Sequence, residues 1–173
     1  TVPQVIAIAE RCRWGRERAL RQGLEPGRCF AVIMIGRLDD YLREVAHDTQ
    51  AEVSEDDFRQ AGLAATKRAY AIYQERHYEA VLLVAALRGS YHLTELAGAG
   101  VIMSIAPPCQ ELFVTQEYPR EVRIDRPVPE NVIARLSRLP EFVRAYEPDG
   151  MGPQEFIAYG VTQRTLSQFY EAG

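Results

Sequence analysis

Two arginines stand where an apolar run of the sequence ends, and side chains of this type can bind an oxyanion. Arg37 follows the run 29–35, and Arg88 follows the run 80–86. A guanidinium group is planar and donates hydrogen bonds in a fork that matches a phosphate or a carboxylate. If the two groups converge at one rim, they form a binding site for such an anion.

A purely structural role for both arginines is equally open. Each can cap the end of its strand, or it can pair with the carboxylate of Asp39, Asp40 or Glu95. Gly36 and Gly89 lie next to the two arginines, and a glycine lets the backbone approach a ligand closely.

The elements that must position the arginines are predicted from hydrophobic patterning. Three runs, 29–35, 80–86 and 101–106, are apolar without alternation, which is typical of parallel strands buried on both faces. Helical patterns separate them, and strands that alternate with helices give a parallel sheet with right-handed crossovers. Binding sites in such folds lie at the carboxyl ends of the strands, which is where the two arginines stand.

The spacing of apolar residues and the capping signals predict the helices. Ser54, with Asp57 three residues later, is an N-cap signature. We interpret the chain as a single α/β domain, with strand–helix units over 1–113 and a helical C-terminal extension over 114–173. The predicted helices span residues 3–22, 54–76, 90–99, 131–146 and 153–171.

Three parallel strands make an incomplete sheet, because its two outer strands leave backbone groups unpaired. Either further strands come from a part outside these residues, or a second copy of the chain covers the edges. We therefore expect a homo-oligomer or association with a missing N-terminal half.

Three strings in the sequence carry a resemblance to a known family. IGRLDDYL, EAVLLVAALRGSYHLTELAGAG and VIMSIAPPCQELF, in this order and spacing, resemble the later part of the transaldolase family, a (β/α)8 TIM barrel of the class I aldolase type. The resemblance covers roughly residues 1–113 and, more loosely, the C-terminal helices. It implies that the three apolar runs are strands six, seven and eight of a partial TIM barrel.

The resemblance also implies a function in the pentose phosphate pathway of carbohydrate metabolism. The complete enzyme would be a transferase that passes a dihydroxyacetone unit between sugar phosphates through a lysine Schiff base, with no metal or cofactor. Arg37 and Arg88 match the arginines that hold the substrate phosphate. Val32 and Ala86 stand where the family places serines, and each lost hydroxyl weakens phosphate binding by roughly 1.5–3 kcal/mol if nothing replaces it. Ser104 matches a position that often carries a hydroxyl, and we assign it no role.

The family's Schiff-base lysine lies on the fourth strand, upstream of these residues, and its helper residues lie on the first, second, third and fifth strands. Lys67 is the sole lysine of the 173 residues. It lies in the middle of the helical string AGLAATKRAYAIYQE, where we expect an exposed, protonated and therefore non-nucleophilic amine. We predict no catalytic residue in this chain and no imine chemistry by the chain alone.

Other polar residues give weaker signals. His47-Asp48 and His92 near Glu95 have the types for acid–base or metal chemistry, but single histidines of this kind are more often surface or hydrogen-bonded residues. Asp39 and Asp40 are adjacent on a helix, so their side chains point apart, and capping of the helix dipole explains them as well.

Composition excludes several function classes. The chain has 47% hydrophobic and 25% charged residues with a net charge of −4, which favours neither nucleic acid nor an anionic membrane. The apolar runs are too short to span a bilayer. Cys12, Cys29 and Cys109 match no zinc motif or disulfide framework, so we expect a reducing, cytoplasmic setting.

Three hypotheses follow. The leading one is the C-terminal part of a transaldolase-like enzyme. The second is a non-catalytic half-barrel that binds a sugar phosphate or a partner, and the third is a module that self-associates through its strand edges.

Overall fold

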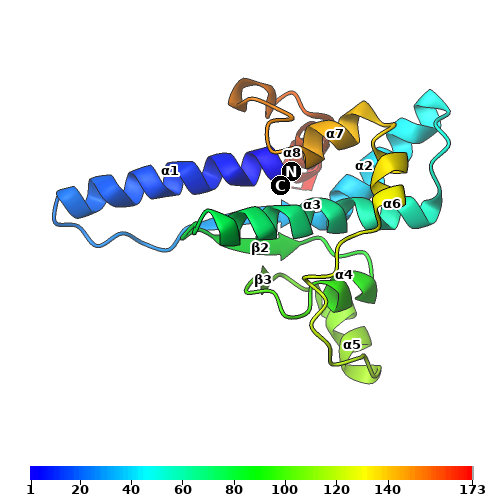
Figure 1. Ribbon diagram of the computed structural model, residues 1–173, viewed down its shortest axis with the longest axis horizontal. Helices are drawn as coiled ribbons and strands as arrows, with labels where there is room; N and C mark the ends of the chain where they lie inside the picture. The colour runs from blue at the N-terminus through cyan, green and yellow to red at the C-terminus, as the bar shows by residue number, and fades with distance from the viewer. Residues whose placement is uncertain (173) are drawn as a thin grey trace.

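The computed structural model, which describes residues 1–172, contains a small parallel sheet flanked by helices (Figure 1). Strands β1 (Phe30–Met34), β2 (Val81–Ala85) and β3 (Ile102–Met103) lie in the order β1-β2-β3, and both pairings are parallel. The predicted α/β architecture with three parallel strands is therefore confirmed.

The third strand is shorter than the apolar run 101–106 suggested. Pro107 and Pro108 open a helix directly afterwards, and proline cannot donate to a strand ladder. The amide of Ser104 still donates to the carbonyl of Val84 at 2.8 Å, so the pairing extends one residue past the strand.

The helices confirm most of the predicted pattern. They are α1 (Val2–Arg21), α2 (Ile35–Thr49), α3 (Glu55–Glu75), α4 (Ser90–Glu95), α5 (Pro107–Thr115), α6 (Glu130–Leu136), α7 (Pro140–Tyr146), a short 3-10 helix η1 (Pro153–Glu155) and α8 (Gly160–Ala172). No helix within residues 1–172 has the length and apolar character that crossing a membrane requires.

Two predicted helices are divided in the structure. The helix expected over 131–146 is α6 followed by α7, because Pro140 occupies the first position of α7 and cannot continue a preceding helix. The helix expected over 153–171 is η1 followed, after residues 156–159, by α8.

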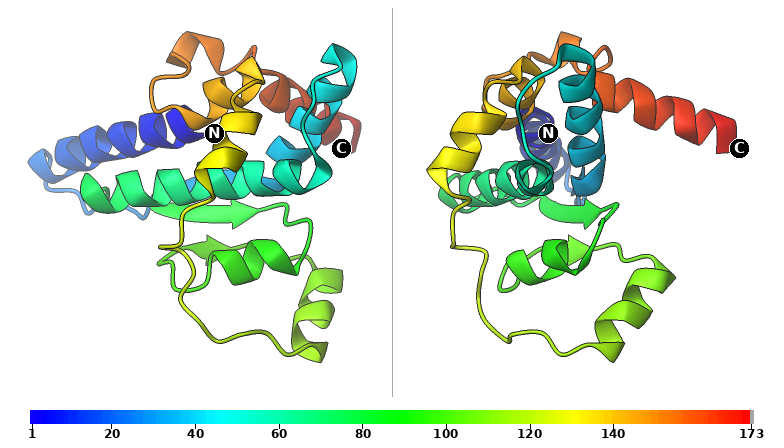
Figure 2. Two further views of the ribbon diagram at one scale, coloured as in Figure 1. Left: turned by 45° about the vertical axis from the view of Figure 1, so that its right-hand side comes forward. Right: turned by 90° about the vertical axis from the view of Figure 1, so that its right-hand side faces the viewer.

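The prediction that the strands are buried on both faces was wrong. Ala31, Ile33, Leu82 and Val84 are at most 4% exposed and belong to one core with α1, α2 and α3. The alternate residues of β1 point the other way, and Val32 is 45% exposed. The helices α1 and α3 lie on the same side of the sheet (Figures 1 and 2), and within residues 1–172 the opposite face of β1 stays open.

Helix α3 is the central element of the packed side, and its N-terminus is firmly capped. The hydroxyl of Ser54 accepts the amide of Asp57 at 3.2 Å, and the Asp57 carboxylate accepts the amide of Ser54 at 3.3 Å. The N-cap prediction is therefore confirmed. The same carboxylate accepts two hydrogen bonds from Arg135 of α6, at 2.7 and 2.9 Å, which joins α3 to the C-terminal helices.

Gly62 of α3 marks the closest approach between α3 and α2. A Cβ at this position would lie 2.3 Å from the carbonyl oxygen of Ile35, whereas a Cβ at Gly15 of α1 would meet nothing within 4 Å. We expect Gly62→Ala to destabilise the fold by about 1–3 kcal/mol because backbone atoms must move apart. Gly15→Ala is the matched control and should stabilise by about 0.5–1 kcal/mol through helix propensity. Urea unfolding measures both, and two changes of the same sign would contradict the packing described.

The ion pair between Asp57 and Arg135 predicts acid sensitivity. The hydrogen bonds from Arg135 lower the pKa of Asp57 to about 2, although burial opposes them. The pKa of Asp57 is near 4 in the unfolded chain and lower in the folded protein, so the ion pair stabilises the fold fully at pH values above about 4. This stabilisation is lost as the pH falls from about 4 to about 2.

We expect Arg135→Met to lower the free energy of unfolding at pH 7 and to lower it by much less at pH 2. Arg138→Met, an exposed neighbour in the same segment, is the control. Urea unfolding at both pH values tests this, and an equal loss for Arg135→Met at pH 7 and pH 2 would refute it.

Candidate functional site

Arg37 and Arg88 line one small pocket of about 90 Å³, here called the rim pocket. Arg37 is on α2, and Arg88 is in the segment that follows β2. Helix α8 closes the third side. The full lining is Arg37, Asp40, Tyr41, Glu44, Arg88, Val161, Arg164, Thr165 and Gln168.

The sheet register explains why these residues meet. Strands β1 and β2 end side by side, with Met34 opposite Ala85, so the segments after them leave the same edge of the sheet. Gly36 makes the approach possible, because a Cβ there would lie 2.4 Å from Cγ of Arg88 and 2.5 Å from the carbonyl oxygen of Ala86. We expected this glycine to admit a ligand, and the structure shows instead that it admits the side chain of Arg88.

Arg88 is held by the protein itself. Its Nε and Nη2 atoms donate to Oδ2 of Asp40 at 3.0 and 2.7 Å, and Nη1 donates to the carbonyl of Ala86 at 2.9 Å. Both structural roles considered for this arginine, pairing with Asp40 and capping its own strand, are therefore present. The side chain of Arg88 remains 39% exposed, so an anion can still reach it from solvent.

Arg37 has no carboxylate partner among residues 1–172, unlike Arg88. Its Nη1 donates to the amide oxygen of Gln168, and its Cζ lies 5.2 Å from the centre of the Phe169 ring. Its Nε is buried without a hydrogen-bond partner in the same set of residues. The neutral amide leaves the charge of Arg37 uncompensated, which favours an incoming anion.

Sequence reasoning missed a third arginine of the rim pocket. Arg164 comes from α8, more than seventy residues after Arg88, and pairs with Glu44 while its Cζ lies 5.3 Å from the Tyr41 ring. No local motif marks it, because only the packing of α8 against α2 brings it there. Three guanidinium groups face two carboxylates, so the rim pocket is net positive.

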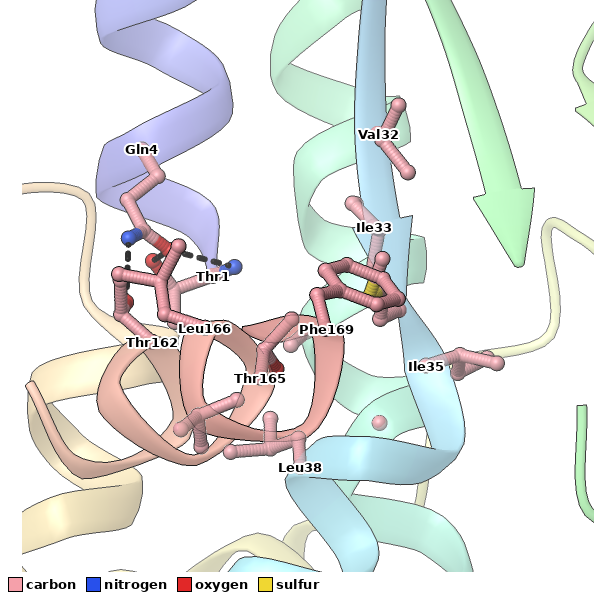
Figure 3. A pocket seen from close by; sticks show the side chains of 14 residues that line it. Thr1, Gln4, Val32, Ile33, Ile35, Leu38, Thr162, Thr165, Leu166 and Phe169 are labelled. Atoms are coloured by element: carbon pink, nitrogen blue, oxygen red, sulfur yellow. Dashed lines mark hydrogen bonds between the residues drawn. The ribbon is translucent and has the colours of Figure 1, made fainter. Parts of the chain in front are cut away.

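A second, apolar pocket of about 210 Å³ lies beside the rim pocket and shares Val161 and Thr165 with it. In Figure 3 the ring of Phe169 of α8 lies beside Ile33 of β1, whereas Leu166 lies toward Gln4 and Thr1 at the start of α1. Gln4 donates to the hydroxyl of Thr162 at 3.0 Å at its edge. The lining is mainly hydrocarbon, so this pocket suits an apolar group and not a phosphate.

Lys67 is not the exposed amine that its place in the sequence suggested. Its side chain is 8% exposed, and Nζ donates to Oε2 of Glu95 at 3.2 Å and to the carbonyls of Arg123 and Arg126 at 3.0 and 2.7 Å. The segment before α6 folds over α3 and supplies these acceptors, which no helical pattern reveals. Three acceptors occupy all three N–H groups of the ammonium, so Lys67 is a structural cross-link.

Glu95 completes this cross-link. It also accepts a hydrogen bond from Arg123 at 2.6 Å. Burial raises the pKa of Glu95, but the hydrogen bonds from Lys67 and Arg123 outweigh burial and hold it below its usual value. The carboxylate therefore stays ionised near neutral pH.

The histidine and aspartate candidates differ clearly in burial and in what they contact. His47 and Asp48 are exposed and 3.4 Å apart, as expected of surface residues. Asp40 faces the rim pocket, whereas Asp39 is buried, which confirms that the two side chains point apart. Capping of the helix dipole does not explain them, because both lie beyond the first turn of α2. His92 is also buried and contacts Asp39 instead of Glu95.

The remaining candidates carry no site. Ser104 is exposed at the end of β3, and Cys12, Cys29 and Cys109 are free. In the part of the chain that the structure describes, no three side chains of the metal-binding types gather.

Comparisons with known proteins add no identification: no protein-family model matches the sequence, and no curated protein matches it either.

The cross-link at Lys67 gives a stability prediction. Lys67→Met keeps the length of the stem but leaves Glu95 and two carbonyls without their donor, so we expect a loss of about 2–4 kcal/mol in the free energy of unfolding. Arg59→Met, an exposed position on the same helix, is the control and should change it by less than about 0.5 kcal/mol. Urea unfolding measures both, and equal small effects would show that the cross-link contributes nothing.

Proposed function

We propose that this chain is the C-terminal part of a transaldolase-like barrel and binds the phosphate of a sugar phosphate in the rim pocket. The three strands correspond to strands six to eight of a partial TIM barrel. In the complete enzyme this site would hold the substrate while a dihydroxyacetone unit passes between sugar phosphates. The chain alone would bind but not catalyse.

One observation carries the proposal. Arg37 and Arg88 leave the carboxyl ends of two adjacent parallel strands and line the same pocket. This is the edge at which α/β sheets and barrels place their ligands. A phosphate there would replace the amide of Gln168 at Arg37 and share Arg88 with Asp40.

The open face of the sheet supports the barrel part of the proposal. Alternate residues of β1 pack against helices, while Phe30 and Val32 are 42% and 45% exposed. A barrel has helices outside and a filled interior, so the exposed residues would face that interior. The order of the strands along the sheet is the same as their order along the chain, as a barrel requires.

A non-catalytic binding protein is the second candidate, and the substituted hydroxyls favour it. Val32 lines the apolar pocket, and Ala86 contributes its carbonyl to Arg88 where the family places a serine. Lys67, the sole lysine, is held by three acceptors. Both candidates share the phosphate site. They differ in whether the complete protein, beyond these residues, carries out imine chemistry.

Calorimetry with fructose 6-phosphate, and with fructose as the control ligand, tests the site. We expect Arg37→Ala and Arg88→Ala each to weaken binding of the phosphate ester about tenfold or more, since each removes charged hydrogen bonds. Asp40→Asn should strengthen binding, because it releases Arg88 from its carboxylate. Arg18→Ala on α1, remote from the rim pocket, should change nothing.

Unchanged binding in both Arg37→Ala and Arg88→Ala would refute the phosphate site. Both candidates predict that this chain forms no imine by itself. Borohydride reduction in the presence of fructose 6-phosphate, followed by measurement of the protein mass, tests this. We expect no adduct, and a stable adduct on Lys67 would show that this chain itself forms an imine.

A further inference from the structure

Two buried titratable side chains, Asp39 and His92, adjoin residues of the rim pocket without lining it, since Asp39 precedes Asp40 and His92 contacts the backbone of Arg88. Asp39 of α2 is 1% exposed and His92 of α4 is fully buried. Nε2 of His92 lies 3.2 Å from Oδ2 of Asp39. Within residues 1–172, neither of these atoms has a hydrogen-bond partner, so the contact between them is a close approach of two buried polar atoms and not an aligned hydrogen bond.

The second ring nitrogen of His92 fixes the position of the proton. Nδ1 accepts the backbone amide of Arg88 at 3.1 Å. An imidazole nitrogen that accepts a hydrogen bond carries no proton, and a neutral ring has one donor and one acceptor. The proton therefore resides on Nε2, the ring nitrogen that lies nearest to Asp39.

The carboxylate of Asp39 is anchored on its other side. Oδ1 accepts the backbone amide of Gly62 at 2.7 Å, in the helix that packs most closely on α2. Asp39 thus presents an acceptor at both oxygens. A continuous chain of contacts runs from α3 through Asp39 and His92 to the backbone of Arg88.

This series of contacts ends at residues 86–88, where the backbone leaves β2 in a strained conformation. Ala86 has φ of +59°, a left-handed conformation that is strained for a residue with a side chain. The carbonyl of Ala86 accepts the amide of Gly36 at 3.2 Å, and His92 fixes the amide two residues further on. These two contacts hold the turn that directs the Arg88 side chain back over α2.

A buried carboxylate and imidazole are costly to desolvate, and apolar residues of similar size would fill the space with less penalty. The orientation that this pair imposes on the ring accounts for two buried polar groups at this point. In a buried carboxylate–imidazole pair, the carboxylate fixes the tautomer and the orientation of the imidazole ring. The ring nitrogen on the other side is then positioned to contact one specific partner.

We propose that Asp39 and His92 are positioning residues for the rim pocket: the carboxylate holds the imidazole in the Nε2–H form, and Nδ1 then fixes the backbone of Arg88 so that its guanidinium faces the anion. The inference deepens the proposed phosphate site and rests on it for the identity of the ligand. The tautomer and the Arg88 contact stand on geometry alone.

Asp39→Asn is the most selective test, because it preserves shape. An asparagine presents one acceptor and one amino group, so either the Gly62 amide or the Nε2–H of His92 meets a donor. If the side-chain oxygen stays on the Gly62 amide, the amino group faces Nε2, and the ring then shifts its proton to Nδ1 and loses the Arg88 amide. Asp40→Asn is the matched control, since Asp40 touches the Arg88 guanidinium but not His92.

Long-range ¹H–¹⁵N NMR of the wild-type chain should show His92 protonated at Nε2 and not at Nδ1. Asp39→Asn should move the proton to Nδ1, speed hydrogen exchange at the Arg88 amide by about tenfold or more, and weaken binding of inorganic phosphate by about tenfold. Asp40→Asn should leave the tautomer unchanged. A wild-type ring protonated at Nδ1 overturns the proposal even if the variant does not fold.

The two proposals fail in different ways. If the wild-type chain binds no phosphate, the proposed function fails, while the tautomer and the Arg88 exchange rate still decide the positioning role. If phosphate binds equally well to wild type and to Asp39→Asn, with the tautomer unchanged, the positioning role is refuted and the rim pocket stands.

Discussion

The fold depends on two close backbone approaches at the start of α2. Gly62 lets α3 lie against the carbonyl of Ile35, and Gly36 lets the end of β2 and the side chain of Arg88 lie against α2. Any side chain at either glycine would push these elements apart. Because α2 is held on both sides in this way, the first strand, the second strand and α3 form one rigid corner, and the rim pocket is built on that corner.

Most of the positive charges at this corner are paired with carboxylates. Nineteen of the twenty basic residues are arginines, and those near the pocket are mostly matched by carboxylates, as Arg88 is by Asp40 and Arg164 is by Glu44. Arg37 is matched only by an amide. The excess of positive charge is therefore concentrated at one guanidinium, and an anion that reaches it displaces a neutral partner and not a charged one.

Local sequence signals predicted the framework but not the surroundings of its side chains. The apolar runs gave all three strands and their parallel direction, and Ser54 with Asp57 gave the start of α3. Apolar runs do not reveal which face of a strand is covered, so the exposure of Val32 was missed. Lys67 and Arg164 were misjudged or overlooked because their partners come from segments more than fifty residues away. The sequence places His92 near Glu95, whereas the carboxylate that it contacts belongs to Asp39, which is distant in sequence and adjacent only after folding.

Helix α8 contributes no fully buried residue, and its C-terminal half projects away from the other helices (Figure 2). A helix with so little apolar area removed from water opens locally at a free energy far below that of global unfolding. Each opening withdraws Gln168 and Phe169 from Arg37. Since Gln168 and Phe169 contact Arg37 from this helix, the access of an anion to Arg37 depends on how firmly α8 packs against α2 and not on the corner beneath it.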